Sequence, residues 1–100
     1  METTKEEMMQ FLQELQNLQL WLSNSSHEIS LYIIFSVFEN SINIDCYTSL
    51  FSDIKGTSKS VYLYSSSSYG ENQTKLNYFI EYVKKLSKYG NAVMIITKSE

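Results

Sequence analysis

The spacing of apolar residues changes along the chain, and each change predicts a new element. Apolar side chains first recur at intervals of three and four, which is the spacing of one helix face. Thr4 followed by Glu7 matches a capping box, so this helix is expected to begin near Thr4 and to end at about Asn24–Ser26. Its expected buried stripe is Met8, Phe11, Leu15, Leu18 and Leu22, widened by Met9, Leu12 and Trp21.

Alternating apolar and polar residues then predict strands at residues 29–38, 42–50 and 60–65. Glu39, Asn40 and Ser41 are expected to form a hairpin turn between the first two. A second apolar stripe predicts a helix at roughly residues 72–89, and the apolar run at 92–97 predicts a closing strand.

The predicted element order is α-β-β-β-α-β, in a single globular domain of residues 1–100. The third strand, second helix and closing strand should form a right-handed crossover with parallel strands, whereas the first three strands should be antiparallel. The expected fold class is therefore α+β (mixed α/β), with a four-stranded mixed sheet and two helices. The 100 residues, of which 43% are hydrophobic, are enough for one core.

The alternation also assigns side chains to the two faces of the sheet. The face expected to contact helices carries Ile33, Phe35, Ile44, Cys46, Val61 and Leu63. The opposite face carries Tyr32, Ile34, Phe38, Tyr47, Tyr62 and Tyr64, which we predict as binding residues. A solvated sheet face would be more polar than this. Either the first helix covers this face, giving three layers, or another chain does; a protein partner and a homodimer both fit.

Composition narrows the function and suggests an origin. The eight basic residues are all lysines. The lack of arginine disfavours a phosphate-transfer enzyme or a sequence-specific DNA-binding protein, because arginine is the usual residue for gripping phosphates. The net charge of −3 divides into −6 for residues 1–50 and +3 for residues 51–100. Abundant Ser, Asn, Ile, Tyr and Lys fit an AT-rich genome, so a viral or mobile-element origin is expected. A single cysteine, no long apolar run and an acidic start predict the cytoplasm, that of the host cell for a viral protein.

The element order, together with SVYLYSSSS, QTKLNYFIEYVKKLSKYG and NAVMIIT, resembles the core of the PD-(D/E)XK nuclease family. The resemblance implies a metal-dependent nuclease, with one acid on the second strand and an acid-x-lysine on the third. Asp45 matches the first acid, but the third strand ends in serines where the acid and lysine belong. Asp53 and Lys55 have the required side chains but precede that strand. An active or degenerate nuclease using Asp45, Asp53 and Lys55 is thus one alternative.

Two further sites are candidates. Ser66, Ser67, Ser68 and Gly70 lead into the second helix and form an anion-binding candidate, although a loop that caps the helix has the same sequence. The sheet tyrosines combined with lysines of the second helix would suit a nucleic-acid-binding module. No cofactor or metal site is expected, and an enzyme is the less favoured class. The leading hypothesis is a small non-enzymatic interaction protein that docks on a host or viral protein, for example as an inhibitor of a defence system.

Overall fold

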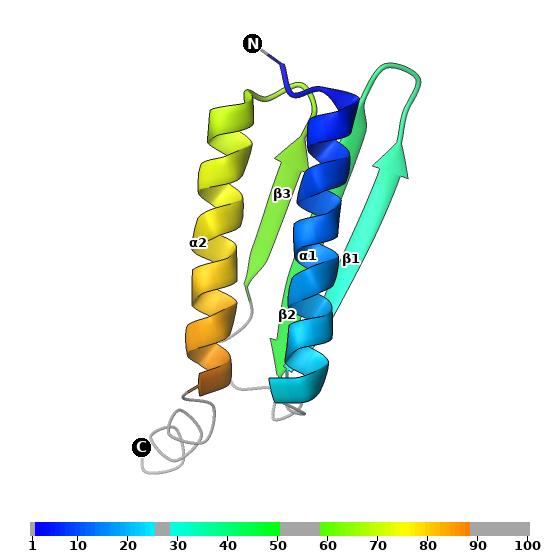
Figure 1. The fold of residues 1–100 in the computed structure, drawn as a ribbon. Coiled ribbons are helices and arrows are strands. Elements are labelled where there is room, and N and C mark those ends of the chain that lie inside the picture. The colour runs from blue at the N-terminus through cyan, green and yellow to red at the C-terminus, as the bar shows by residue number, and fades with distance from the viewer. Residues whose placement is uncertain (1, 26–28, 51–58, 89–100) are drawn as a thin grey trace.

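A computed structural model describes residues 2–25, 29–50 and 59–88 and shows an α+β fold (Figure 1). The elements are α1 (Lys5–Ser25), β1 (Ile29–Val37), β2 (Ile42–Leu50), β3 (Ser60–Tyr64) and α2 (Tyr69–Lys88). This order confirms the first five predicted elements. The predicted closing strand at 92–97 lies outside the described residues.

The start of α1 is fixed by the predicted capping box. The Thr4 amide donates to Glu7 Oε1 at 2.8 Å, and the Glu7 amide donates to Thr4 Oγ1 at 3.1 Å. These bonds satisfy two amides that the helix itself leaves without acceptors. The predicted stripe from Met8 to Leu22 is buried, but Met9 and Trp21 were wrongly assigned to it, since both remain exposed.

The three strands form an antiparallel sheet in the order β1-β2-β3. The register pairs Ile33 with Cys46 and Cys46 with Val61. The predicted hairpin turn is present, because the Phe38 amide donates to the Ser41 carbonyl at 2.8 Å. Over the described residues the sheet therefore has three antiparallel strands, where the sequence predicted four strands in a mixed sheet.

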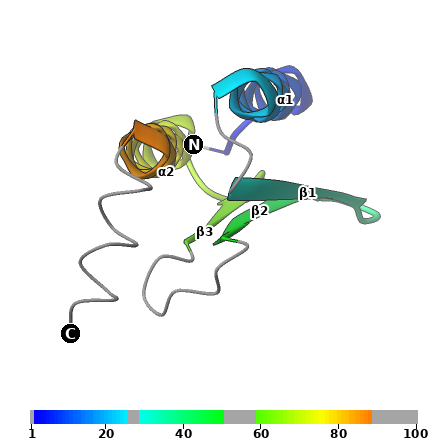
Figure 2. The same ribbon diagram turned by 90° about the horizontal axis from the view of Figure 1, so that it is seen from below.

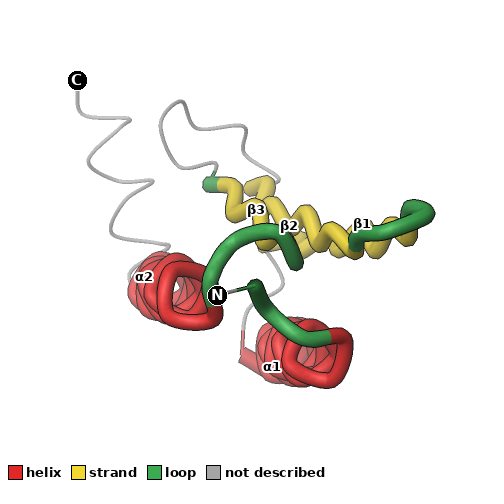
Figure 3. Tube along the Cα trace, turned by 90° about the horizontal axis from the view of Figure 1, so that it is seen from above, coloured by secondary structure: helices red, strands yellow, loops and turns green. Residues whose placement is uncertain are grey.

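Both helices lie on the same face of the sheet, as the two end-on views show (Figures 2 and 3). α1 packs on β1 and β2, and α2 packs on β3 and against α1. The described part of the molecule thus has two layers, and of the two alternatives for the second sheet face, cover by the first helix is wrong. The buried core between the layers includes Phe11, Ile44, Leu63, Leu76 and Phe79.

The helix-facing side is not covered equally along its length. Ile44, Cys46, Val61 and Leu63 are buried as predicted, whereas Ile33 is half-buried. Phe35, also assigned to this side, is 39% exposed. The hairpin end of β1 diverges sideways from α1 (Figures 1 and 3), so neither α1 nor α2 lies over it.

Helix α2 begins at Tyr69, three residues before the predicted start. Ser68 Oγ accepts a hydrogen bond from the Glu71 amide at 3.2 Å, which is the usual role of a serine preceding a first helical turn. The predicted apolar stripe of α2 is buried at Leu76, Phe79, Val83 and Leu86, and Ile80 is half-buried. In the first turn of α2, the buried Asn72 side chain donates a hydrogen bond to Thr3 Oγ1, just before α1.

Candidate functional site

The sheet side away from the helices, which we call the open face, carries the predicted binding residues. Tyr32, Ile34, Tyr47 and Tyr62 are 39–49% exposed, and Phe38, directly after β1, is 56% exposed. Tyr64 is half-buried. None of the described helices lies over this face (Figure 2), so its aromatic residues face outward.

The strand register brings these side chains into neighbouring rows. Tyr32 pairs with Tyr47, and their rings are stacked with centroids 5.1 Å apart and an interplanar angle of 24°. The next row contains Ile34, Asp45 and Tyr62. The open face is therefore a continuous aromatic and aliphatic surface with a half-buried carboxylate, Asp45, in its middle.

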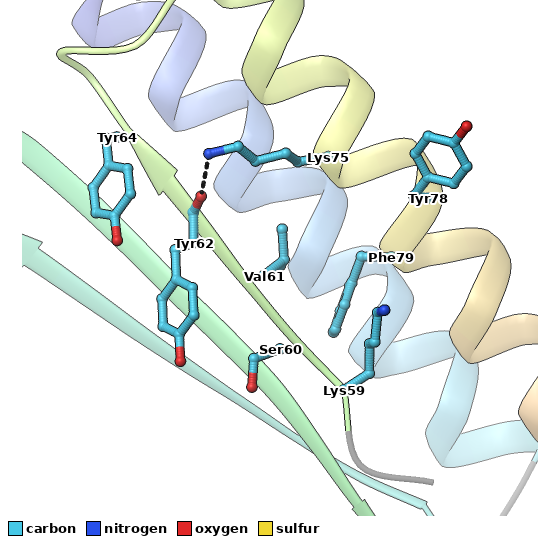
Figure 4. A pocket seen from close by; sticks show the side chains of 8 residues that line it. All are labelled: Lys59, Ser60, Val61, Tyr62, Tyr64, Lys75, Tyr78 and Phe79. Atoms are coloured by element: carbon cyan, nitrogen blue, oxygen red, sulfur yellow. Dashed lines mark hydrogen bonds between the residues drawn. The ribbon is translucent and has the colours of Figure 1, made fainter. Parts of the chain in front are cut away.

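A cavity of about 380 Å³ lies beside β3, between the strand and α2 (Figure 4). Its lining is Lys59, Ser60, Val61, Tyr62, Tyr64, Lys75, Tyr78 and Phe79. The Lys75 ammonium donates to the Tyr62 carbonyl at 3.2 Å and lies 5.4 Å from the centre of the Tyr64 ring. Sequence reasoning missed this cavity, because the pattern along the chain does not show which turn of α2 faces β3.

Two lysines of α2 lie at different surfaces: Lys75 contacts the sheet tyrosines at β3, whereas Lys84 does not. Lys84 Nζ lies 5.4 Å from the centre of the Trp21 ring, at the contact between the two helices. That contact is on the opposite side of the sheet from the open face (Figure 2). Lys75 is the lysine that reaches the β3 edge. A nucleic-acid surface built from both groups would have to wrap around β3.

The serine turn before α2 is used to connect elements. Ser68 caps the helix, and the Ser67 carbonyl accepts hydrogen bonds from the Thr3 amide at 3.0 Å and from Thr3 Oγ1 at 2.7 Å. Ser66 and Gly70 are exposed. The hydrogen bonds of Ser67 and Ser68 match the capping-loop interpretation of this segment.

The residues predicted for a nuclease are only partly described. Asp45 lies on β2 with its side chain on the open face, while Asp53 and Lys55 fall outside the described residues. Within the described ranges no group of three or more His, Cys, Asp or Glu residues is placed to hold a metal ion. Cys46 is buried in the core, and burial raises the pKa of its thiol from 9.0 to about 12. The thiol therefore stays protonated at neutral pH and is a poor nucleophile.

The chain matches no protein-family model, no curated protein and no solved structure. The described helices include none that is long and apolar enough to cross a membrane. The functional argument therefore depends on the geometry of this chain alone.

Proposed function

We propose that this protein is a non-enzymatic interaction module that docks another protein on the open face of its sheet. The observation that carries the proposal is the exposure of Tyr32, Ile34, Tyr47 and Tyr62 on one face while both described helices pack on the other. Tyrosine offers a large contact area together with a polar group, and it is enriched in protein interfaces.

The arrangement of the open face supports a protein ligand over a nucleic acid. Stacking of Tyr32 on Tyr47 occupies one face of each ring, so fewer ring faces are free to stack on bases. Asp45 places a carboxylate between Ile34 and Tyr62, where it would repel phosphates but would accept hydrogen bonds from a protein. Under the predicted viral origin, the expected partner is a host or viral protein, and inhibition of a defence system is one role that such docking would serve.

The experiment that tests the proposal compares partner capture by open-face variants. Tyr47→Lys and Tyr62→Lys remove aromatic contact area, and neither adds a negative charge beside Asp45. Leu20→Lys is the control, because Leu20 is 65% exposed on α1, which lies on the other side of the sheet from the open face (Figure 2). Each purified chain is immobilised, exposed to extract of the source cells, and the retained proteins are identified by mass spectrometry.

The proposal predicts that one set of proteins binds both the wild type and Leu20→Lys, and that these proteins do not bind Tyr47→Lys or Tyr62→Lys. Circular dichroism confirms that the variants remain folded. Equal capture by all four chains would contradict docking on the open face. A gel shift with single-stranded and double-stranded nucleic acid at low salt would favour the nucleic-acid alternative instead, if it is lost in Tyr47→Ala and Tyr62→Ala, which remove the rings without adding positive charge.

A further inference from the structure

The outer edge of β1 has main-chain groups that do not face β2. The Thr48 amide donates to the Lys59 carbonyl at 2.9 Å, and the Ser65 amide donates to the Ile42 carbonyl at 2.9 Å. Even-numbered residues of β2 therefore bond to β3, and its odd-numbered residues bond to β1. With the observed register, the outward amides and carbonyls of β1 belong to Ile29, Leu31, Ile33, Phe35 and Val37.

One of these groups is capped from α1. Gln19 Nε2 donates to the Leu31 carbonyl at 2.9 Å. Among the described residues no hydrogen bond reaches the outward groups of Ile33, Phe35 and Val37. The side chains of Phe35 and Val37 are also exposed, Val37 by 67%, because α1 diverges from this end of the strand (Figure 1). As far as the structure describes the chain, the hairpin half of the β1 edge is thus open to another strand.

This edge lacks the features that usually prevent pairing between strands. Exposed edges are commonly protected by charged side chains, a proline or a β-bulge. β1 reads ISLYIIFSV, without a charged residue or a proline. Its pairing with β2 is continuous over nine residues, so no bulge bends the edge away.

We propose that two copies of the chain pair through the outer edges of their β1 strands, antiparallel and about a two-fold axis at Phe35. In this register Ile33 of each copy bonds to Val37 of the second copy, and Phe35 bonds to Phe35 of the second copy. The pairing satisfies the open amides and carbonyls. It also leaves the hydrogen bond from Gln19 to the Leu31 carbonyl intact. A pairing centred on Ile33 would instead place Phe35 of the second copy opposite Leu31, and its amide would compete with Gln19 for that carbonyl.

A second copy fits this edge because the edge is complementary to itself. Each outward residue offers one donor and one acceptor, and no charged side chain of β1 would repel its equivalent. On the helix side, Phe35 and Val37 of both copies would meet and lose exposed apolar area. On the open face, Tyr32 would lie opposite Phe38 of the second copy. The inference concerns the strand edge and does not depend on what the open face binds.

The test begins with the mass of the full chain in solution, measured by light scattering over a range of concentrations. The wild type is expected at twice the chain mass. Val37→Pro removes the outward amide from an edge position, where proline is tolerated, and should weaken the dimer at least ~10-fold. Val37→Thr, which keeps the amide and the branched side chain, is the matched control and should remain a dimer. A monomeric wild type, or a dimer that is unchanged in Val37→Pro, would overturn the proposal.

Two more variants guard against misfolding and test the register. Phe35→Lys places like charges opposite each other at the two-fold axis and should give a folded monomer by circular dichroism and light scattering. Phe35→Cys should form a disulfide between copies on mild oxidation. In antiparallel strands, directly opposed residues that bond to each other through their main chains have Cα atoms about 5.5 Å apart, which a disulfide can span. Val37→Cys should link far less, because it faces Ile33. The buried Cys46 thiol, with a pKa of about 12, is not expected to compete. Linking by Val37→Cys and not by Phe35→Cys would refute the two-fold axis.

Discussion

Asn72 Nδ2 donates a hydrogen bond of 2.9 Å to Thr3 Oγ1, across 69 residues of sequence. Asn72 is 0% exposed, and its amide also binds Tyr64, donating to the carbonyl at 2.8 Å and accepting from the backbone amide at 3.3 Å. Thr3 in turn donates to the Ser67 carbonyl. One asparagine therefore joins the entry to α1, the end of β3 and the first turn of α2.

Replacing Asn72 should destabilise the fold. Asn72→Ala leaves the Tyr64 amide without its acceptor and removes one of two donors to the Tyr64 carbonyl, which keeps the bond from the Ser67 amide. We expect a loss of about 1–3 kcal/mol in the free energy of unfolding. Asn77→Ala is the control, because Asn77 is exposed on the same helix and bonds only to Gln73 among the described contacts. Urea unfolding followed by circular dichroism measures both. Equal stability of the two variants would contradict a structural role for the Asn72 amide.

Ser68→Ala should cost about 1 kcal/mol of stability, because the Glu71 amide loses its capping acceptor. Ser66→Ala, at an exposed position of the same turn, should change stability by less than about 0.5 kcal/mol. Thermal unfolding of both variants beside the wild type provides the comparison. A Ser66→Ala chain as unstable as Ser68→Ala would show that the capping bond is not the cause.

Because the Cys46 thiol is buried, we expect the free energy of unfolding to fall at alkaline pH. Burial raises its folded pKa to about 12 from 9.0, so only the unfolded thiol ionises between these values. The stabilising contribution is complete below pH 9 and is lost as the pH rises towards 12. Tyrosines and lysines titrate in the same range, so the measurement is the difference between the wild type and Cys46→Ala. That difference should shrink from pH 8 to pH 11; a constant difference would mean that Cys46 ionises equally in both states.

The nuclease alternative is tested directly with DNA and magnesium or manganese. We expect no cleavage above that of a buffer blank, because serines follow β3 where the nuclease resemblance requires an acid and a lysine. Asp45→Asn should therefore leave the result unchanged. Cleavage by the wild type that disappears in Asp45→Asn would restore Asp45 to a metal-binding role.

Local periodicity predicted most of the described fold. The α1 stripe, the Thr4 capping box and the alternation of the strands depend on residues close in sequence, so they can be read without knowing the packing. The open face followed from the same alternation. The kind of molecule that binds the open face could not be predicted in this way, because side-chain type alone does not identify a ligand.

The missed features depend on contacts between distant segments. Asn72 lies in a polar stretch of the kind that usually forms an exposed helix start, and its burial depends on where Thr3 lies. Phe35 has the spacing of a core residue, but its exposure depends on the angle between α1 and the hairpin. The cavity beside Lys75 depends on how α2 packs on β3. None of these relationships leaves a periodic signal in the chain.

The bond between Thr3 and Asn72 also has a consequence for folding kinetics. Bringing together residues so far apart has a larger loop-closure cost than forming the hairpin of β1 and β2, so the bond is expected to form after the rate-limiting step. Mutations that remove it should then accelerate unfolding while leaving the refolding rate nearly unchanged. The contact is thus expected to lengthen the lifetime of the folded state without changing how fast that state forms.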